Sequence, residues 1–238
     1  MTSTSPIMMN KQSLYKHTSK AFLLSLAGVI MLPMSGYAFS SAISSANVTP
    51  YAYNSGSSSI ITVGNETQEK FIDTMAGDAI TFLADTSLTE DDKKAKFASL
   101  LSNSFDLETI GRFALGRHWR TASPAQRDEY QSLFKKMIIA VYSKRFGDYQ
   151  GQKFEVTGSH GEEGSDITVE SKIIPANGGQ PITVEWRVRT KNGQNKIIDI
   201  IVEGVSMALT QRSEFASVIQ RGGGDISVLI DHLSQFSN

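Results

Sequence analysis

The hydrophobic positions between residues 66 and 147 repeat with the period of an α-helix. Apolar residues recur three or four positions apart, which places them on one face of each helix. Thr89, Asp106 and Ser123 stand where helices would begin, because their side chains can accept hydrogen bonds from free backbone N–H groups. Ser123 also has Gln126 three residues later, which is the spacing of a capping box. The pattern predicts four helices in this region.

After Gly151 the hydrophobic period changes to two, which is typical of strands with one buried face. Residues 177–179 (Asn-Gly-Gly) and 191–193 (Lys-Asn-Gly) separate the alternating runs and favour hairpin turns. The last run, residues 196–202, is apolar on both faces except at Asp199, and this predicts a central strand. About four antiparallel strands are expected.

Helical spacing returns at residues 210–221, and a final amphipathic helix follows the glycines at 222–224. Helices first, strands next and helices last predict an α+β domain, with a curved antiparallel sheet of about four strands packed against several helices.

The N-terminal residues predict export from the cytoplasm. Three lysines precede an uncharged apolar run at residues 21–34, and small residues follow it up to Ala38. We therefore expect residues 1–38 to be a signal peptide that is cleaved off. Residues 39–65 are rich in Ser, Gly and Asn and predict a disordered tether. Residues 66–238 would then form the α+β domain.

Charge and cysteine content narrow the class of protein. Residues 1–38 hold three of the 23 basic residues and no acidic one, so residues 39–238 carry 20 basic against 24 acidic side chains. An acidic surface of this kind argues against nucleic-acid binding. The absence of cysteine excludes an acylated lipoprotein and favours a bacterial periplasm.

Residues that could carry chemistry are sparse. His118, His160 and His232 have no metal-ligand spacing, and no G-x-S-x-G nucleophile turn exists. Gly222–Gly224 lacks the lysine of a phosphate-binding loop and is interpreted as a helix break. We expect no metal, no cofactor and no catalytic residue.

Asp199 is the one candidate for acid–base chemistry. It stands among isoleucines, where an unpaired carboxylate would be costly. It could act as the base of a small-molecule isomerase or dehydratase. We favour the alternative that it pairs with Arg187 or Arg189 on the neighbouring strand, because no second acid or base is evident nearby.

Two separated motifs resemble those of the MlaC (toluene-tolerance) family. The first is residues 115–130, where a basic and aromatic stretch leads into Ser-Pro-Ala-Gln-Arg. The second is residues 200–207, a strand ending in Glu-Gly-Val-Ser-Met, followed by Gln-Arg-Ser-Glu-Phe at 211–215. Residues 183–187 are also similar. The chain departs from the pattern at His118-Trp119, where family members have a pair of tyrosines.

The resemblance implies a fold like the cystatin cone with added helices around an apolar pocket. It also implies a non-enzymatic periplasmic carrier of phospholipid, working between an inner-membrane ABC lipid-transport complex and an outer-membrane lipoprotein–porin complex to maintain outer-membrane lipid asymmetry. A hopanoid or sterol-like cargo and a chaperone or adaptor with a solid interior are the alternatives.

From the inward faces of the predicted elements, we expect twelve residues to line such a pocket: Phe82, Leu100, Phe113, Leu133, Met137, Val141, Val169, Val184, Trp186, Ile200, Val202 and Met207. Arg117 and Arg120 are candidates for its mouth, with a solvated helix end as the alternative.

Overall fold

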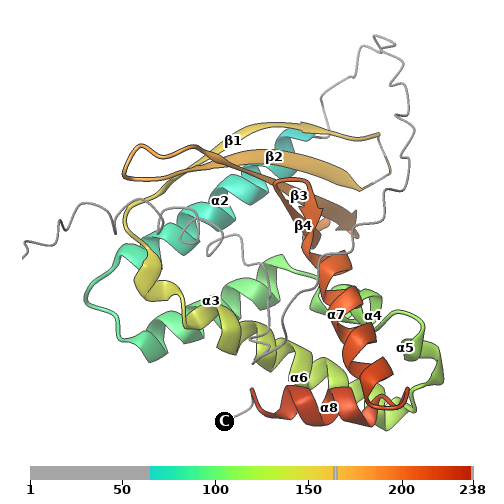
Figure 1. The fold of residues 1–238 in the computed structure, drawn as a ribbon. Helices are drawn as coiled ribbons and strands as arrows, with labels where there is room; N and C mark the ends of the chain where they lie inside the picture. The colour runs from blue at the N-terminus through green and yellow to red at the C-terminus, as the bar shows by residue number, and fades with distance from the viewer. Residues whose placement is uncertain (1–64, 163, 165, 237–238) are drawn as a thin grey trace, which may run out of the picture.

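The computed structural model describes residues 65–162, 164 and 166–236. An open antiparallel sheet forms its upper layer in Figure 1, with the strands in chain order. The strands are β1 (Lys153–His160), β2 (Ile167–Ile174), β3 (Ile182–Lys191), β4 (Gln194–Val202) and β5 (Val205–Ser206). The predicted α+β class with an antiparallel sheet is confirmed, and the short β5 is one strand more than expected.

The turn between β3 and β4 has the conformation that its sequence favours. Asn192 and Gly193 have φ of 52° and 73°, both in the left-handed region that a two-residue hairpin of the primed type requires. Close to the middle of the same pair of strands, Arg187 faces Asp199 and Val188 faces Ile197. Ile198 is therefore an extra residue in β4, a bulge that changes the direction of the side chains after it.

Seven α-helices and one short 3₁₀ segment complete the described part of the chain. They are α2 (Asn65–Ala84), α3 (Glu90–Ser104), α4 (Leu107–Leu115), α5 (His118–Thr121), α6 (Pro124–Ser143), η2 (Phe146–Asp148), α7 (Met207–Arg221) and α8 (Ser227–Ser234). Thr89 and Ser123 each form a capping box, with Asp92 and Gln126 respectively. Asp106 caps α4 through the backbone N–H of Thr109.

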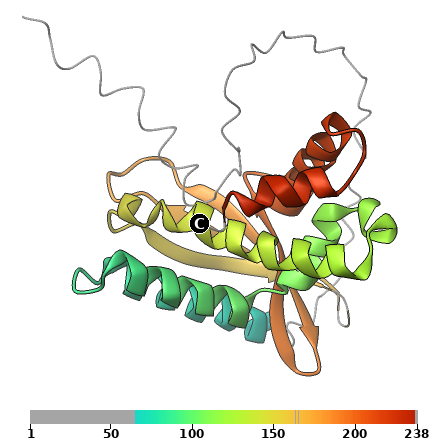
Figure 2. The ribbon, with the colours of Figure 1, turned by 90° about the horizontal axis from the view of Figure 1, so that it is seen from below.

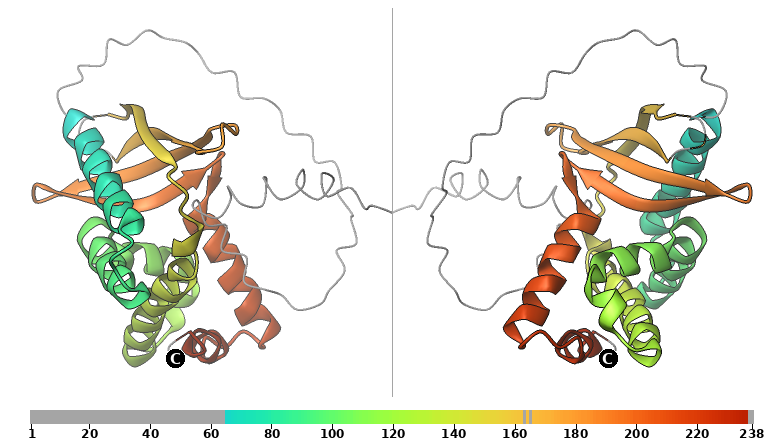
Figure 3. Two further views of the ribbon diagram at one scale, coloured as in Figure 1. Left: turned by 90° about the vertical axis from the view of Figure 1, so that its left-hand side faces the viewer. Right: turned by 90° about the vertical axis from the view of Figure 1, so that its right-hand side faces the viewer.

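All the helices lie on one side of the sheet. Helix α2 crosses the sheet face beside β1 and β2, while α3, α6, α7 and α8 form a lower level (Figures 1 and 3). Seen from below, α3 and α6 run under the sheet, and α7 and α8 flank α6 (Figure 2). A site between the two levels is thus enclosed by elements from both ends of the described chain.

The buried core is divided in the same way. One cluster joins the helices and centres on Tyr130, Phe134 and Phe215. Two smaller clusters lie under the sheet, one where α2 covers β2 and β3, the other near Val184 and Met207. Space between these clusters is therefore bounded by apolar side chains on several sides.

Several details differ from the sequence-based expectations. β4 was expected to be central, but its outer neighbour is only the two-residue β5, so it lies almost at the sheet edge. Helix α6 ends at Ser143 instead of near Gly147, and α7 begins at Met207 instead of Thr210. The predicted signal peptide (1–38) and tether (39–65) lie outside the described residues, apart from Asn65, where α2 begins.

Candidate functional site: an apolar cavity between sheet and helices

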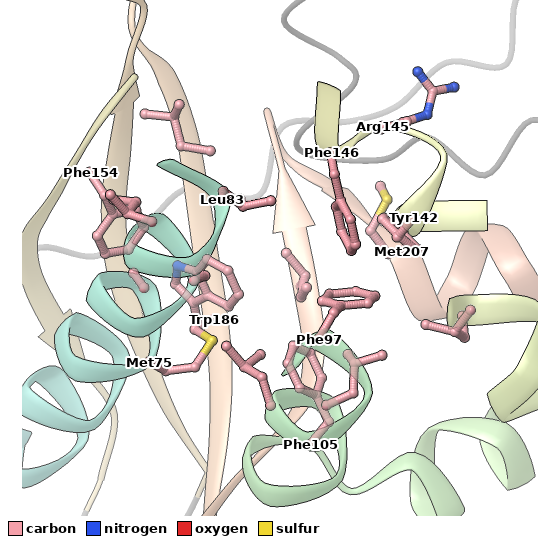
Figure 4. Close-up of a pocket in the computed structure, with 18 of the residues that line it drawn as sticks. Met75, Leu83, Phe97, Phe105, Tyr142, Arg145, Phe146, Phe154, Trp186 and Met207 are labelled. Atoms are coloured by element: carbon pink, nitrogen blue, oxygen red, sulfur yellow. The ribbon is translucent and has the colours of Figure 1, made fainter. Parts of the chain in front are cut away.

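A cavity lies between the sheet and the lower level of helices (Figure 4). Its volume is about 250 Å³. Pockets for small ligands typically measure roughly 300–1,000 Å³. The walls come from helices α2, α3, α4, α6 and α7 and from strands β1 to β4, and most of the side chains that line the cavity are apolar. The cavity is thus built to hold an apolar molecule.

Aromatic rings form the wall next to η2. Phe97 on α3 meets Phe146 edge-on, with the ring centroids 5.3 Å apart, and Phe146 meets Phe82 of α2 in the same manner at 6.2 Å. Tyr142 of α6 lies 6.3 Å from Phe97. Edge-to-face contacts hold rings in fixed relative orientations, so this wall joins three helices and η2 without closing the cavity (Figure 4).

Trp186 forms the wall on the sheet side. Its indole N–H donates to Ser171 Oγ at 2.8 Å, and that hydroxyl donates to the carbonyl of Val184 at 2.9 Å. Phe154 of β1 packs edge-on against the indole at 6.1 Å. Because the polar N–H is satisfied within the sheet, the rest of the ring presents only carbon to the cavity.

Asp199 lies at the edge of the cavity, where it supports the start of α7. Its Oδ1 accepts hydrogen bonds from the backbone N–H groups of Ile200 at 2.9 Å and Ala208 at 3.0 Å, and its Oδ2 accepts one from Ser206 Oγ at 2.6 Å. Arg187 Nη1 is 3.9 Å from Oδ2, so the predicted pairing with Arg187 is confirmed. Both carboxylate oxygens are therefore engaged in hydrogen bonds within the protein.

Polar groups gather where α7 faces α6. Gln211 is 2% exposed, lines the cavity and donates from Nε2 to Glu214 Oε2 at 3.3 Å. Burial raises the pKa of Glu214 from its usual 4.5 to about 7. Burial likewise raises the pKa of Tyr142 to about 12, with Glu214 adding to the increase and Arg145 opposing it. The phenol therefore stays neutral at physiological pH.

The two cationic lining residues are exposed and form the rim of the cavity. Arg145 and Lys153 are exposed, and Arg145 extends away from the interior in Figure 4. Gln152, between them in the lining, is buried and accepts the N–H of Gln150 at 2.9 Å. The cavity thus has an apolar interior and a cationic rim, an arrangement suited to a molecule with apolar chains and an anionic end.

Five of the twelve residues predicted to line a pocket do line this cavity: Phe82, Leu100, Trp186, Ile200 and Met207. The other seven lie outside its lining. On α6, Leu133, Met137 and Val141 pack into the cluster between the helices. In the sheet, Val169 packs beneath α2, and Val184 and Val202 pack in the cluster that contains Met207.

Phe113 is 39% exposed, on the outer side of α4, where Arg212 stacks over its ring at 5.3 Å. Arg117 and Arg120, the candidates for the mouth, lie at and within α5, outside the lining of the cavity. The positions of Arg117 and Arg120 therefore fit the alternative, a solvated helix end, better than the mouth of the cavity.

Three residues of α6 line the cavity although they were not among the predicted lining residues: Phe134, Ile138 and Tyr142. These form a stripe with a spacing of four, one residue away from the predicted stripe of Leu133, Met137 and Val141. Both stripes are apolar, so hydrophobicity alone does not separate them. The tyrosine at the end of one stripe was the available signal, because its hydroxyl favours a position beside a polar opening.

Other chemistry is not evident in the part of the chain that the structure describes. His118, His160 and His232 lie on separate elements, and no group of acidic and histidine side chains among the described residues is arranged to hold a metal ion. Among the described helices, none combines the length and apolar character that a bilayer span requires.

Comparison with known proteins agrees with this geometry. The family model described as MlaC protein matches residues 73–235. The intermembrane phospholipid transport system binding protein MlaC of Haemophilus influenzae is 30% identical over 134 residues, which cover 55% of this chain and 61% of that protein. The toluene tolerance protein of Pseudomonas putida is 27% identical over 115 residues, 48% of this chain and 53% of that protein. The matched stretch thus spans somewhat more than half of each relative.

A solved structure shares the fold. The phospholipid-binding protein from Ralstonia solanacearum, determined in complex with a phospholipid, superposes with a TM-score of 0.61 at 24% identity, over 71% of this chain and 95% of that chain. The family match takes in most of α2, the whole sheet and helices α3 to α8. The chain therefore belongs to the MlaC family.

Proposed function

We propose that this protein is a periplasmic carrier that holds a phospholipid in the cavity between sheet and helices. It moves the lipid between an ABC transport complex in the inner membrane and a lipoprotein–porin complex in the outer membrane, and so maintains the lipid asymmetry of the outer membrane. The carrier role is supported by the names of its relatives, one a phospholipid transport binding protein and another solved with a phospholipid bound.

The observation that carries the proposal is the composition of the cavity. Its interior is almost wholly alkyl and aromatic. The indole N–H of Trp186 already donates a hydrogen bond to Ser171. Each methylene that leaves water contributes about 0.8 kcal/mol. An acyl chain of ordinary length therefore gains enough to stay bound in water, and its release would need contact with a partner complex or a membrane.

The cationic rim supports a phospholipid over an uncharged lipid. Arg145 and Lys153 lie where a headgroup would remain in solvent while its chains enter the cavity. Cationic side chains hold phosphate oxygens through charge-assisted hydrogen bonds. A hopanoid or sterol-like molecule would use the apolar walls alone, and the experiment below distinguishes the two cargoes.

The test is native mass spectrometry of the protein purified from a bacterial periplasm, followed by extraction and identification of the bound lipid. Adducts of phospholipid mass support the proposal, whereas a neutral polycyclic lipid would identify the alternative cargo. A clean protein mass, with no uptake from labelled liposomes, would overturn the carrier function.

A matched pair of variants ties the result to this cavity. Ala79→Phe places a ring in the lining of α2, and Ala95→Phe makes the same change on the exposed side of α3. Because protein interiors are close-packed, Ala79→Phe should displace lipid while Ala95→Phe keeps it. Equal lipid loads in the two folded variants would place the lipid elsewhere.

The partners need a separate experiment. Liposomes containing the inner-membrane transporter should exchange labelled phospholipid with the carrier faster than liposomes without it. Equal rates would contradict the proposed place between two membrane complexes and leave the lipid-binding role intact.

A further inference from the structure

Gln211 occupies an unusual position for a polar residue. It follows Met207 by four positions, so both side chains lie on the face of α7 that borders the cavity. Ser206 caps this helix at Leu209, and Asp199 holds its first turn at Ala208, so the backbone that carries Gln211 is fixed. The residue is only 2% exposed.

One half of the Gln211 carboxamide has a partner and the other half has none. Its Nε2 donates to Glu214 Oε2, which turns the amide oxygen away from that carboxyl group. The oxygen, Oε1, is buried and has no hydrogen-bond partner among the described residues. Such a group is costly in a folded protein because it has lost its bonds to water, so an orphan acceptor requires an explanation.

Gln211 Oε1 is distinct from the other buried polar atoms near the cavity. The two further orphan atoms among the described residues belong to Gln68 and His232, neither of which lines the cavity. Asp199 and Gln152 do line it, but their oxygens already accept hydrogen bonds from the protein. Within the described lining, Gln211 Oε1 is therefore the one buried side-chain oxygen without a hydrogen-bond partner, and a bound molecule can supply it.

An acceptor requires a donor, and the surroundings limit what kind of molecule brings one. A molecule that fills the alkyl and aromatic walls is mainly hydrocarbon, and the donor that such a molecule carries at little cost is a hydroxyl group. An ester carbonyl or a phosphate oxygen has no proton to give and would leave Oε1 unpaired.

We propose that Gln211 is a specificity-determining residue of the cavity, whose Oε1 accepts a hydrogen bond from a hydroxyl group of the bound lipid. The inference rests on the proposed carrier function and deepens it by naming the favoured cargo as a hydroxyl-bearing lipid. The hydroxyl belongs either to a free glycerol position of a monoacyl phospholipid or to a hydroxylated acyl chain.

The test uses two pairs of lipids that differ only in the hydroxyl group. One pair is palmitoyl lysophosphatidylethanolamine and its 2-deoxy analogue; the other is a phosphatidylethanolamine with a 12-hydroxystearoyl chain and its stearoyl counterpart. Equimolar members of each pair compete for the full protein, and native mass spectrometry reads the bound ratio. We expect a preference of about three- to tenfold for the hydroxyl lipid in one pair, the range that one hydrogen bond supplies. That pair identifies the source of the hydroxyl.

Two variants assign the preference. Gln211→Met keeps a similar length and removes the acceptor, so the preference should vanish while total lipid binding persists. Gln68→Met makes the same change at a buried glutamine that lies outside the lining and also has an unpartnered Oε1, and the preference should remain. A folded Gln211→Met protein that keeps the preference would overturn the assignment to Gln211.

The behaviour of the unaltered protein decides the proposal even if a variant fails to fold. Equal binding within both pairs would overturn the hydroxyl recognition and leave the carrier function standing. Binding of none of the four lipids would overturn the carrier function itself.

Discussion

The carboxylate of Asp199 on β4 accepts a hydrogen bond from the backbone N–H of Ala208 in the first turn of α7, with 3.0 Å between Oδ1 and N. The end of the sheet and the start of the helix beside the cavity are thereby joined through one buried side chain. The same carboxylate accepts a hydrogen bond from the hydroxyl group of Ser206, the residue that caps α7. Asp199 thus stabilises the junction between the sheet and α7.

Asp199→Ala should lower the free energy of unfolding by about 2–3 kcal/mol, because it leaves two buried backbone N–H groups and a hydroxyl without their acceptor. Asp199→Asn keeps one acceptor oxygen and should cost about half as much. Urea denaturation measures both. Asp166→Asn, at the partly exposed pair with Arg189, is the control and should cost less than about 1 kcal/mol. A dehydratase function would instead appear as activity lost in a fully stable Asp199→Asn protein.

Glu214 should make the protein less stable as the pH rises. Burial raises its pKa to about 7, above its usual 4.5, so between these values the folded state holds a proton that the unfolded state has released. The free energy of unfolding must then fall from about pH 4.5 to about pH 7. Because the side chain is half-exposed to solvent screening, we expect a loss of only about 1 kcal/mol. Urea unfolding at several pH values should show this slope, and it should be absent in Glu214→Gln. An identical pH dependence in both proteins would contradict the burial of this carboxyl group.

Trp186 should report directly on the contents of the cavity. The chain contains two tryptophans, and Trp119 lies outside the cavity lining, between the guanidinium groups of Arg112 and Arg127. In a Trp119→Phe protein, lipid with a brominated acyl chain should quench most of the remaining fluorescence, because the bromine enters beside the indole. In a Trp186→Phe protein the same lipid should quench little. Equal quenching in the two proteins would place the acyl chain elsewhere.

Gly116 should not tolerate a side chain. Its φ of 59° combines with a ψ of −129°, a conformation that is strained for every other residue, and an added Cβ would lie 2.9 Å from Arg212 Nε. Gly116→Ala should therefore lower the free energy of unfolding by about 1–3 kcal/mol. Gly77→Ala is the matched control on α2, where nothing lies within 4 Å, and it should stabilise the protein by about 0.4–1 kcal/mol. Thermal unfolding checks both, and equal shifts of the same sign would contradict the strain at Gly116.

Local signals in the sequence predicted the elements well because they act over a few residues. The capping pair Ser123 and Gln126, the cap at Asp106 and the turn at Asn192-Gly193 all appear in the structure as expected. The position of β4 was predicted less well, because its isoleucines on both sides of Asp199 resemble those of a strand with neighbours on both sides. In the structure, β4 has no second long strand beside it. Its apolar residues are explained by the bulge at Ile198 and by the helices that pack against the sheet.

The cavity could be predicted only in part, because a cavity is a mismatch between neighbouring packed layers. Leu133 and Phe134 are consecutive, equally apolar residues of α6 and both pack in the cluster between the helices, yet only Phe134 also lines the cavity. The position of one α6 stripe beside the cavity depends on how the neighbouring helices and strands pack. The sequence of α6 alone does not specify that packing. Asp199 was interpreted correctly because the cost of burying a charge does not depend on such long-range geometry.

The lining of the cavity extends along the chain from Met75 to Gln211, so its walls are contributed by segments that are synthesised far apart in time. Contacts of such long sequence separation form late in folding, since the entropy of closing the intervening loops must first be overcome. A chain that still lacks α7 has α2 and all five strands, but not the wall that carries Met207, Ala208 and Gln211. On the proposed carrier function, the cavity is then complete only in a molecule that has finished folding, and cargo would be acquired after that point.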